Sequence, residues 1–314
     1  MPANPMAVET ITRTTPSGAV IANVRRVGAA LASLVYDGRE VVRPDSDAMR
    51  VNFSSGVTLA PWPNRLAGGH WTHDGHTYRG ARNEPSGNAL HGLVYGRTFD
   101  LVEHLGDALR LSCQLGGDAI YPFTLRVDVS YAVTELGLSC TYEVTNLDSV
   151  RLPVGLGAHP FFPFDDTCVL TLRAASLFEN DEQLIPTGRL LPSSLRGVNA
   201  GGTTPLAGFV ADDCFTDLVR GADGLADTSI TYGDGFTTHV WQDASFPYTQ
   251  VFTKRDFAFA DGVDAAIAIE AQTAPANALQ TGAGLRWLEP AEQWRATWGI
   301  AVASPNQPPP LGSR

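Results

Sequence analysis

The sequence predicts an all-β protein, a large antiparallel β-sandwich with few short helices. Apolar and polar residues alternate over long stretches, and alternate side chains lie on opposite faces of a strand. No stretch of more than about ten residues keeps a helical apolar period without Gly or Pro. The 314 residues include 31 Gly and 21 Pro, which is typical of a turn-rich β protein.

The predicted strands follow one another along the chain with turn residues between them. The clearest is Leu125–Val133, and Leu136–Val144 repeats its alternation after a tight turn, which predicts an antiparallel hairpin. The last run, Trp294–Val302, has the same period. Shorter strands are predicted at Ala19–Val24, Leu109–Leu115, Val169–Leu172, Tyr248–Phe252 and Ala265–Ile269.

The predicted organisation is one domain, residues 9–304, between two short tails at 1–8 and 305–314. Hydrophobic residues make up 44% of the chain, enough for a large core. No Pro/Ser-rich linker divides the middle of the chain, and no repeat of 20–50 residues is present. The second tail contains Gln-Pro-Pro-Pro, which favours a mobile end.

Charge and composition exclude several function classes. The formal net charge is -11, from 33 acidic and 22 basic residues, which argues against binding to nucleic acid or to an anionic membrane. Lys254 is the sole lysine, so a Schiff-base mechanism is disfavoured. With no signal peptide and no apolar run long enough to span a bilayer, we expect a cytoplasmic protein.

The four cysteines, Cys113, Cys140, Cys168 and Cys214, lie far apart and form no Cys-x-x-Cys pair. We therefore expect buried free thiols in a reducing compartment rather than a disulfide framework. The sequence also contains no phosphate-binding loop and no Gly-x-Ser-x-Gly nucleophile motif. Its Gly-x-Gly fragments are too short to indicate a dinucleotide site.

Three evenly spaced histidines, His70, His73 and His76, suggest a metal site at first sight. An Asp74-Gly75 turn separates the last two, so we expect an exposed hairpin, because metal ligands must converge rather than merely be evenly spaced. His104 and His239 lie in strand-like contexts without an identified partner. No metal is predicted.

Two other histidines have contexts that suit a cleft. His91 lies between a Ser-Gly-Asn turn and a Gly, and His159 lies among Gly, Pro and Phe directly after a strand. Such positions favour the lining of a binding site. The alternative is that both are core histidines bonded to backbone.

Several charged residues are candidates for the same site. Glu270 ends the apolar run Ala265–Ile269 and precedes a polar loop, with a solvated rim charge as the alternative. Asp212 and Asp213 form an acidic pair. Arg65 follows Asn64 in a Pro-Trp-Pro-Asn-Arg segment, where its fixed fork of donors suits the binding of hydroxyls.

Taken in order, these segments resemble the aldose 1-epimerase (galactose mutarotase) family, in its broad bacterial branch. Each motif alone is weak, but their common order over most of the chain is specific. The matching segments are Asn64-Arg65-Leu66, the hairpin with Gly75 and Tyr78, Leu90-His91-Gly92, His159-Pro160-Phe161-Phe162, Asp212-x-x-Phe215, Ile269-Glu270 and Leu288-Glu289-Pro290-Ala291-Glu292.

The resemblance implies a galactose mutarotase-like β-sandwich with one cleft for a monosaccharide and no cofactor. It implies that His159 is the general acid and Glu270 the general base of ring opening. His91 would bind near the anomeric centre, while Arg65, Asn64 and one aspartate would hold sugar hydroxyls. The family pattern favours Asp212, with Asp213 as the alternative. We expect neighbouring groups to keep His159 protonated near neutral pH.

The expected activity is therefore the interconversion of the α and β anomers of a free aldohexose such as glucose or galactose. Alternatives are a hexose-6-phosphate 1-epimerase, which needs a basic pocket, a non-catalytic carbohydrate-binding domain, and a hydrolase with paired carboxylates. The expected partner is a monosaccharide, and the protein is a monomer or homodimer. One departure is Ala291, where many relatives have Gly.

Overall fold

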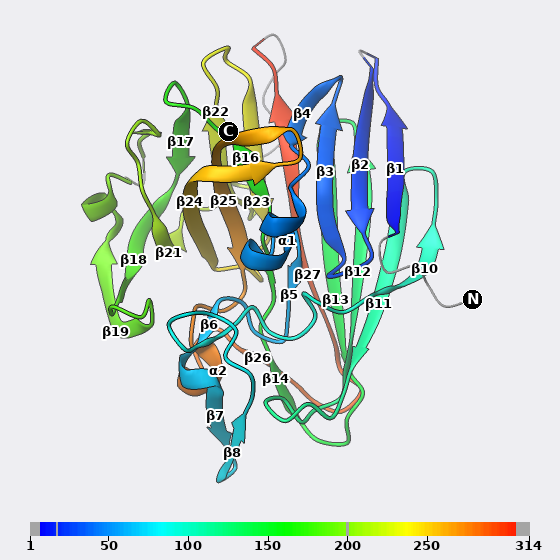
Figure 1. Cartoon of the computed structure of the whole chain (residues 1–314), viewed down its shortest axis with the longest axis vertical. Helices are drawn as coiled ribbons and strands as arrows, with labels where there is room; N and C mark the ends of the chain where they lie inside the picture. Colours follow the sequence, from blue (N-terminus) through cyan, green and yellow to red (C-terminus); the bar gives the residue numbers. More distant parts are fainter. Residues whose placement is uncertain (1–6, 17, 199–200, 306–314) are drawn as a thin grey trace.

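The computed structural model describes residues 7–16, 18–198 and 201–305, and it confirms the all-β prediction (Figure 1). All the pairings between its named strands are antiparallel. Two large sheets and one smaller sheet make up the body. Parts of the predicted tails, residues 1–6 and 306–314, lie outside the described residues, and the first strand begins at Val8, inside the first tail.

The largest sheet has nine strands in the order β10-β11-β12-β13-β27-β23-β22-β17-β20. They are β10 (Asp100–His104), β11 (Ala108–Leu115), β12 (Leu125–Thr134), β13 (Gly137–Asn146), β27 (Gln293–Ala303), β23 (Thr237–Gln242), β22 (Ala226–Thr231), β17 (Val169–Leu172) and β20 (Thr204–Pro205). β12, β13 and β27 confirm the clearest period-2 runs, and β11 and β17 confirm two of the shorter predicted strands.

The second large sheet carries most of the candidate residues. Its main path is β19-β18-β21-β24-β25-β15-β5, and β16 pairs with β25 beside it. The strands are β19 (Pro186–Pro192), β18 (Ala174–Asn180), β21 (Asp212–Leu218), β24 (Tyr248–Phe259), β25 (Gly262–Gln272), β15 (Gly157–Ala158), β5 (Thr58–Leu59) and β16 (Phe161–Pro163). β24 and β25 are longer than predicted, so Glu270 lies inside β25 rather than after its end.

A four-stranded sheet packs against one end of the nine-stranded sheet, where β1 contacts β11 and β12 and β2 contacts β12 (Figure 1). Its strands are β1 (Val8–Thr14), β2 (Ala19–Arg25), β3 (Ala30–Tyr36) and β4 (Arg39–Val42). The remaining elements are β6 (Arg65–Leu66) with β9 (Ala89–Leu90), β7 (His70–His73) with β8 (His76–Arg79), β14 (Leu152–Val154) with β26 (Arg286–Leu288), α1 (Asp47–Phe53), α2 (Ala278–Thr281), η1 (Ala67–Gly69) and η2 (Ser193–Arg196).

One continuous hydrophobic core joins the three sheets. It includes Ile11 of the four-stranded sheet, Tyr142 and Trp298 of the nine-stranded sheet, and Phe215 and Ile269 of the eight-stranded sheet. Alternating burial along β12 and β13 accounts for this packing, because each strand turns one face inward. We therefore propose that residues 9–304 form one domain. The four cysteines are free and buried, as expected.

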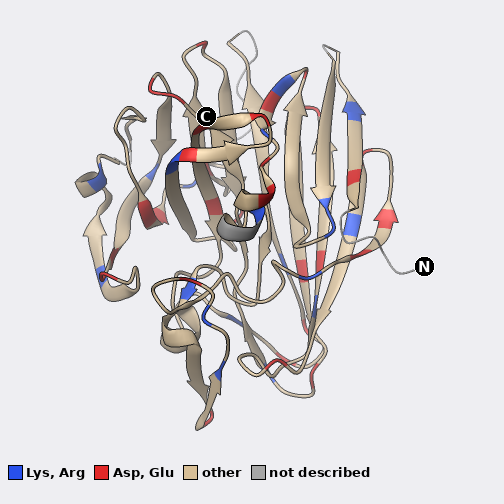
Figure 2. Ribbon diagram, in the orientation of Figure 1, with Lys and Arg blue, Asp and Glu red and all other residues tan. Residues whose placement is uncertain are grey.

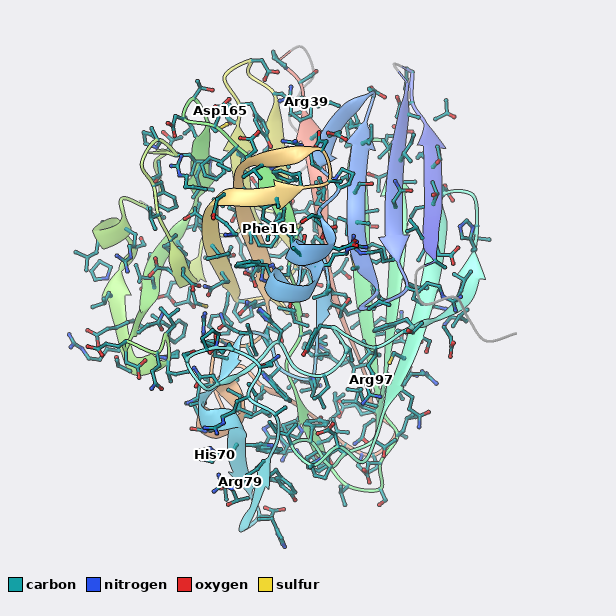
Figure 3. All side chains as sticks on the ribbon, in the orientation of Figure 1. Arg39, His70, Arg79, Arg97, Phe161 and Asp165 are labelled. Carbon is teal, nitrogen blue, oxygen red and sulfur yellow. The ribbon has the colours of Figure 1, made fainter. Side chains whose placement is uncertain are left out.

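The His70–His76 segment forms the predicted hairpin, with His73 and His76 beside its turn. Figure 3 shows His70 and Arg79 on this hairpin, away from Phe161 in the sheet. The described residues contain no group of three or more His, Cys, Asp or Glu side chains arranged to hold a metal ion. His239, which had no partner in the sequence analysis, has its Nδ1 3.0 Å from Asp227 Oδ2. Among the described residues, no helix is long and apolar enough to cross a bilayer.

Ala291 departs from glycine at a position whose backbone favours glycine. The Glu292 amide donates to the Glu289 carbonyl at 2.9 Å, and Ala291 has a φ of 64°. Pro290 and Ala291 are thus the central residues of a type II turn, in which the second central residue is normally Gly.

We expect Ala291→Gly to raise the free energy of unfolding by about 0.5–1 kcal/mol, because relief of left-handed strain exceeds the added chain entropy. Urea denaturation of both proteins measures this change. A lower midpoint for the variant would show that the turn does not strain Ala291.

Candidate active site

A cavity of about 600 Å³ opens on the eight-stranded sheet, and all six residues expected at the site line it. They come from separate parts of the chain, which the fold brings together. The lining comprises Phe53, Asn64, Arg65, Asn83, Glu84, Pro85, Leu90, His91, His159, Asp212, Gln250, Phe252 and Glu270.

Glu270 is fixed by its own strand and the next. It lies opposite Gln250 in the β24–β25 register, and its residue is only 2% exposed. Gln272, two residues on and therefore on the same face of β25, donates from Nε2 to Glu270 Oε2 at 2.9 Å. The other carboxylate oxygen, Oε1, is left to face the cavity and His159. Glu270 is therefore a held carboxyl and not a solvated rim charge.

His159 follows β15 and is also buried. Its Nε2 lies 3.4 Å from Glu270 Oε1. The imidazole packs edge-on against His91 and tilted against Phe161, with ring centroids 5.0 Å apart in each case. The backbone carbonyl of His159 accepts a hydrogen bond from the Gly56 amide at 2.8 Å. Both the main chain and the ring of this residue are thus fixed.

Burial shifts the pKa values of Glu270 and His159 in opposite directions. It raises the pKa of the Glu270 carboxyl well above its usual range, and it lowers the pKa of the His159 imidazole to about 4. Both shifts favour the uncharged form, because a buried charge loses its hydration. The expectation that neighbouring groups keep His159 protonated near neutral pH is therefore wrong, because burial outweighs their effect.

His91 is placed by a strained backbone segment. Its φ is 66° and that of Asn64 is 57°, and the His91 amide donates to the Asn64 carbonyl at 2.9 Å. Two left-handed residues thus fix each other, as is common at functional sites. The next residue, Gly92, must lack a side chain, because a Cβ at this position would clash with the Ala60 carbonyl. Burial, with smaller contributions from His159 and Arg65, lowers the pKa of His91.

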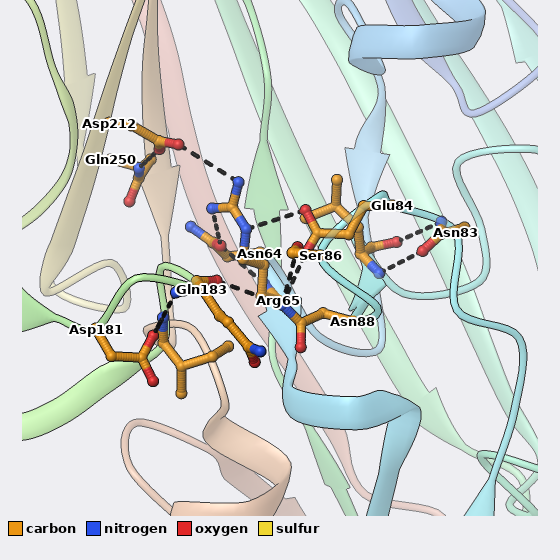
Figure 4. Close-up of polar contacts among 12 residues, drawn as sticks. Asn64, Arg65, Asn83, Glu84, Ser86, Asn88, Asp181, Gln183, Asp212 and Gln250 are labelled. Carbon is orange, nitrogen blue, oxygen red and sulfur yellow. Dashed lines mark hydrogen bonds and ion pairs between the residues drawn. The ribbon is translucent and has the colours of Figure 1, made fainter.

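Arg65 lies between two carboxylates that also line the cavity (Figure 4). Its Nε donates to Glu84 Oε2 at 3.1 Å, and its Nη2 donates to Asp212 Oδ2 at 3.4 Å. Gln250 Nε2 donates to Asp212 Oδ1 at 2.6 Å. Burial raises the pKa of Asp212, against the opposing effects of Arg65 and Gln250. The wall therefore presents a fixed row of donors and acceptors suited to hydroxyl groups.

The strand alternation distinguishes the two neighbouring aspartates. Asp212 lines the cavity, whereas Asp213 points to the other face of β21, where its Oδ2 lies 3.0 Å from Arg196 Nε. Asp212 is thus the one of the two aspartates that lines this cavity.

Several site residues were not found from the sequence. Glu84 and Gln250 contact Arg65 and Asp212, and Gln272 contacts Glu270. Phe53 and Phe252 form a stacked aromatic wall, with centroids 6.3 Å apart and an interplanar angle of 13°. The one available signal was period-2 spacing, which places Gln272 on the same face as Glu270.

A sequence model of the aldose 1-epimerase family matches residues 10–301 of this chain. The chain belongs to the aldose 1-epimerase family. Solved structures agree with the fold of this family. A C. elegans GalM/aldose epimerase homologue superimposes with a TM-score of 0.81 at 19% identity, covering 96% of this chain and 100% of that one. The galactose 1-epimerase of Lactobacillus acidophilus gives a TM-score of 0.76 at 17% identity, with 94% of each chain covered.

Curated proteins related to this chain align with it over shorter stretches than the family model does. YihR of Escherichia coli, described as uncharacterized, is 33% identical over 176 residues, or 53% of this chain and 56% of YihR. The galactose mutarotase of Sus scrofa is 32% identical over 149 residues, or 44% of this chain and 42% of that protein. The aligned region thus spans about half the length of these relatives.

Proposed function

We propose that this protein is a mutarotase that interconverts the α and β anomers of a free aldohexose such as glucose or galactose. The observation that carries the proposal is the buried Glu270–His159 pair, with Oε1 and Nε2 3.4 Å apart, in a cavity that Arg65, Asn64 and Asp212 also line. Family membership supports the same reaction type.

The reaction needs one proton removed and one proton added. In the proposed mechanism Glu270 takes the proton from the anomeric O1 hydroxyl while His159 gives a proton to the ring oxygen O5. The C1–O5 bond breaks, and C1 becomes an aldehyde carbon. After rotation about C1–C2 the two residues exchange roles, and the ring closes with the opposite anomeric configuration.

One shared proton is sufficient for this cycle. Before reaction the proton must lie on His159, with Glu270 as the carboxylate, although burial favours the reverse distribution. A polar sugar replaces part of the lost hydration and supplies oxygen atoms to both groups. Proton transfer across the 3.4 Å contact then gives the reactive pair. The remaining side chains hold the sugar, with Arg65, Asn64 and Asp212 at the hydroxyls and His91 near the anomeric centre.

This proton count predicts the pH dependence of kcat/KM. Because burial lowers the pKa of His159 to about 4, activity should stay constant through neutral pH and fall as the pH approaches about 4, where the pair gains a second proton. Because burial raises the pKa of Glu270, the alkaline fall should begin only when the shared proton is lost, far above the usual carboxyl range. Polarimetry across pH measures the profile after subtraction of the uncatalysed rate. An acid limb near pH 6.5, the ordinary value for histidine, would contradict this assignment.

The proposed activity is tested by following freshly dissolved α-D-glucose and α-D-galactose by polarimetry, with and without protein. Faster relaxation to the same final rotation supports a mutarotase and ranks the two sugars. Binding of either sugar without faster relaxation would instead indicate a non-catalytic carbohydrate-binding protein.

The charge of the cavity disfavours a phosphorylated sugar. Arg65 is the one Arg or Lys side chain among the described residues lining it, and Glu84 and Asp212 already pair with its guanidinium. Figure 2 shows the other Lys and Arg residues scattered over the sheets among acidic residues. A phosphate would have to compete with those carboxylates, so we propose a free aldose.

A further inference from the structure

Three of the residues that line the cavity lie on three neighbouring strands of the eight-stranded sheet. Glu270 lies on β25, Gln250 lies opposite it on β24, and Asp212 lies on β21 within hydrogen-bonding distance of Gln250. Asp212 lies opposite Phe252, two residues from Gln250 on β24. Two strand steps of about 4.8 Å and two residues of about 3.4 Å along the strand therefore separate Glu270 from Asp212, or roughly 12 Å between their backbones. If C1 of a sugar lies at Glu270, as the proposed function requires, its C4–C6 end lies toward Asp212.

Beyond Asp212 the sheet opens. The register of β18 with β21 ends at the pair Leu177 and Phe215, and the pairing of β18 with β19 is irregular between Phe178 and Asn180. β18 and β21 therefore diverge beside Asp212. The space between them is a second cavity of about 550 Å³, and Asp212 lines both this cavity and the first.

Seven of the thirteen residues that line the second cavity are apolar, and five of the other six are charged. Its apolar residues include Leu177, Phe178, Leu184, Leu191, Leu195 and Val210. Its charged side chains already have partners within the protein. Glu179 accepts from Thr187, Asp181 accepts from the backbone amides of Gln183 and Ile185, and Asp213 pairs with Arg196.

This chemistry suits an apolar group better than a hydroxylated one. A second sugar would place several of its hydroxyls against the leucines, Phe178 and Val210, which offer no hydrogen bonds in return. An apolar group would remove apolar surface from water on both sides. The amide oxygen of Asn180 is buried without a hydrogen-bond partner, so at most a single polar atom is favoured there.

We propose that the second cavity binds an apolar substituent carried at the C4 or C6 end of the aldose. The substrates it favours are aldoses with a free anomeric centre and an aryl, alkyl or acyl group at that end. This inference rests on the proposed mutarotase function, because it uses the sugar orientation set by Glu270 and His159.

The test compares anomer exchange of D-glucose, 6-O-benzyl-D-glucose and 4-O-benzyl-D-glucose by selective-inversion NMR at anomeric equilibrium, so that no pure anomer is needed. We expect kcat/KM for at least one ether to exceed that for D-glucose about tenfold, from partial burial of one aromatic ring. The 4-O ether replaces a hydroxyl near Asp212, and comparison with the 6-O ether shows which position points into the cavity.

A double variant, Leu195→Asp with Val210→Asp, removes apolar surface from the second cavity. Both residues are well exposed, at 66% and 71%, so the fold tolerates the changes. We expect the ether-to-glucose ratio to fall to about one. Leu190→Asp is the matched control, because Leu190 of β19 is 50% exposed but does not line the cavity.

The outcomes separate this inference from the function it rests on. Faster exchange of D-glucose with no advantage for either ether would overturn the second cavity as a subsite and leave the mutarotase proposal in place. An equal loss of ratio in the Leu190→Asp control would also overturn it. Failure to accelerate any of the three sugars would overturn both proposals.

Discussion

Glu270→Gln is expected to lower kcat/KM for aldose anomer exchange by about 10²–10⁴-fold, the contribution of one positioned proton-transfer group. The amide has nearly the same shape as the carboxyl but cannot take the proton from O1. Because Oε2 already accepts from Gln272, the side-chain oxygen of the introduced glutamine can keep that hydrogen bond. The loss should therefore appear mainly in kcat, with KM little changed.

The same substitution should not destabilise the fold. Burial raises the pKa of Glu270 and so disfavours its charge, which means that a neutral side chain of equal size fits this position at least as well. Thermal unfolding should give an unchanged or higher midpoint. Glu103→Gln, on the exposed strand β10, is the control and should keep full activity. An active Glu270→Gln enzyme would remove Glu270 from the role of general base.

Much of the fold was predictable because the period-2 signal is local. The apolar faces of β12, β13 and β27 alternate over eight or more residues, and no helix-length pattern competes with them. Strand order was not predictable, because pairs such as β13 with β27 join residues far apart in the chain. Strand ends were also uncertain, since β25 continues through Glu270 into a polar segment that resembles a loop.

In the candidate site too, residues with a distinctive local sequence were predictable, and residues placed by long-range pairing were not. His91, His159 and Glu270 occur in unusual local sequences and in the order of the family motifs, so they were identifiable. Gln250 was not, because its role depends on lying opposite Glu270 across β24 and β25. Glu84 was missed for a similar reason, since it reaches Arg65 from a loop 19 residues further along the chain.

Protonation was the part of the site that sequence reasoning misjudged. The residue types indicated an acid and a base, but the pKa of each depends on burial. Glu270 and His159 are 2% and 5% exposed, and burial is the largest influence on the pKa of each, ahead of the opposing effect of Arg65 on Glu270. Desolvation therefore favours the uncharged form of each group.

His159→Asn is expected to lower kcat/KM by about 10²–10⁴-fold, because asparagine cannot transfer a proton to the ring oxygen. The imidazole space borders the cavity, so the loss of packing against His91 and Phe161 should be modest. Added imidazole should restore part of the activity by occupying that space, a rescue that a purely structural role would not produce.

His239→Asn is the matched control, because His239 is a buried histidine paired with Asp227 outside the cavity. It should keep normal anomer exchange. The double variant Glu270→Gln with His159→Asn should be little slower than either single variant, since groups that share one proton act as a unit. Losses that multiply in the double variant would mean that Glu270 and His159 act independently, and the single-proton mechanism would then be wrong.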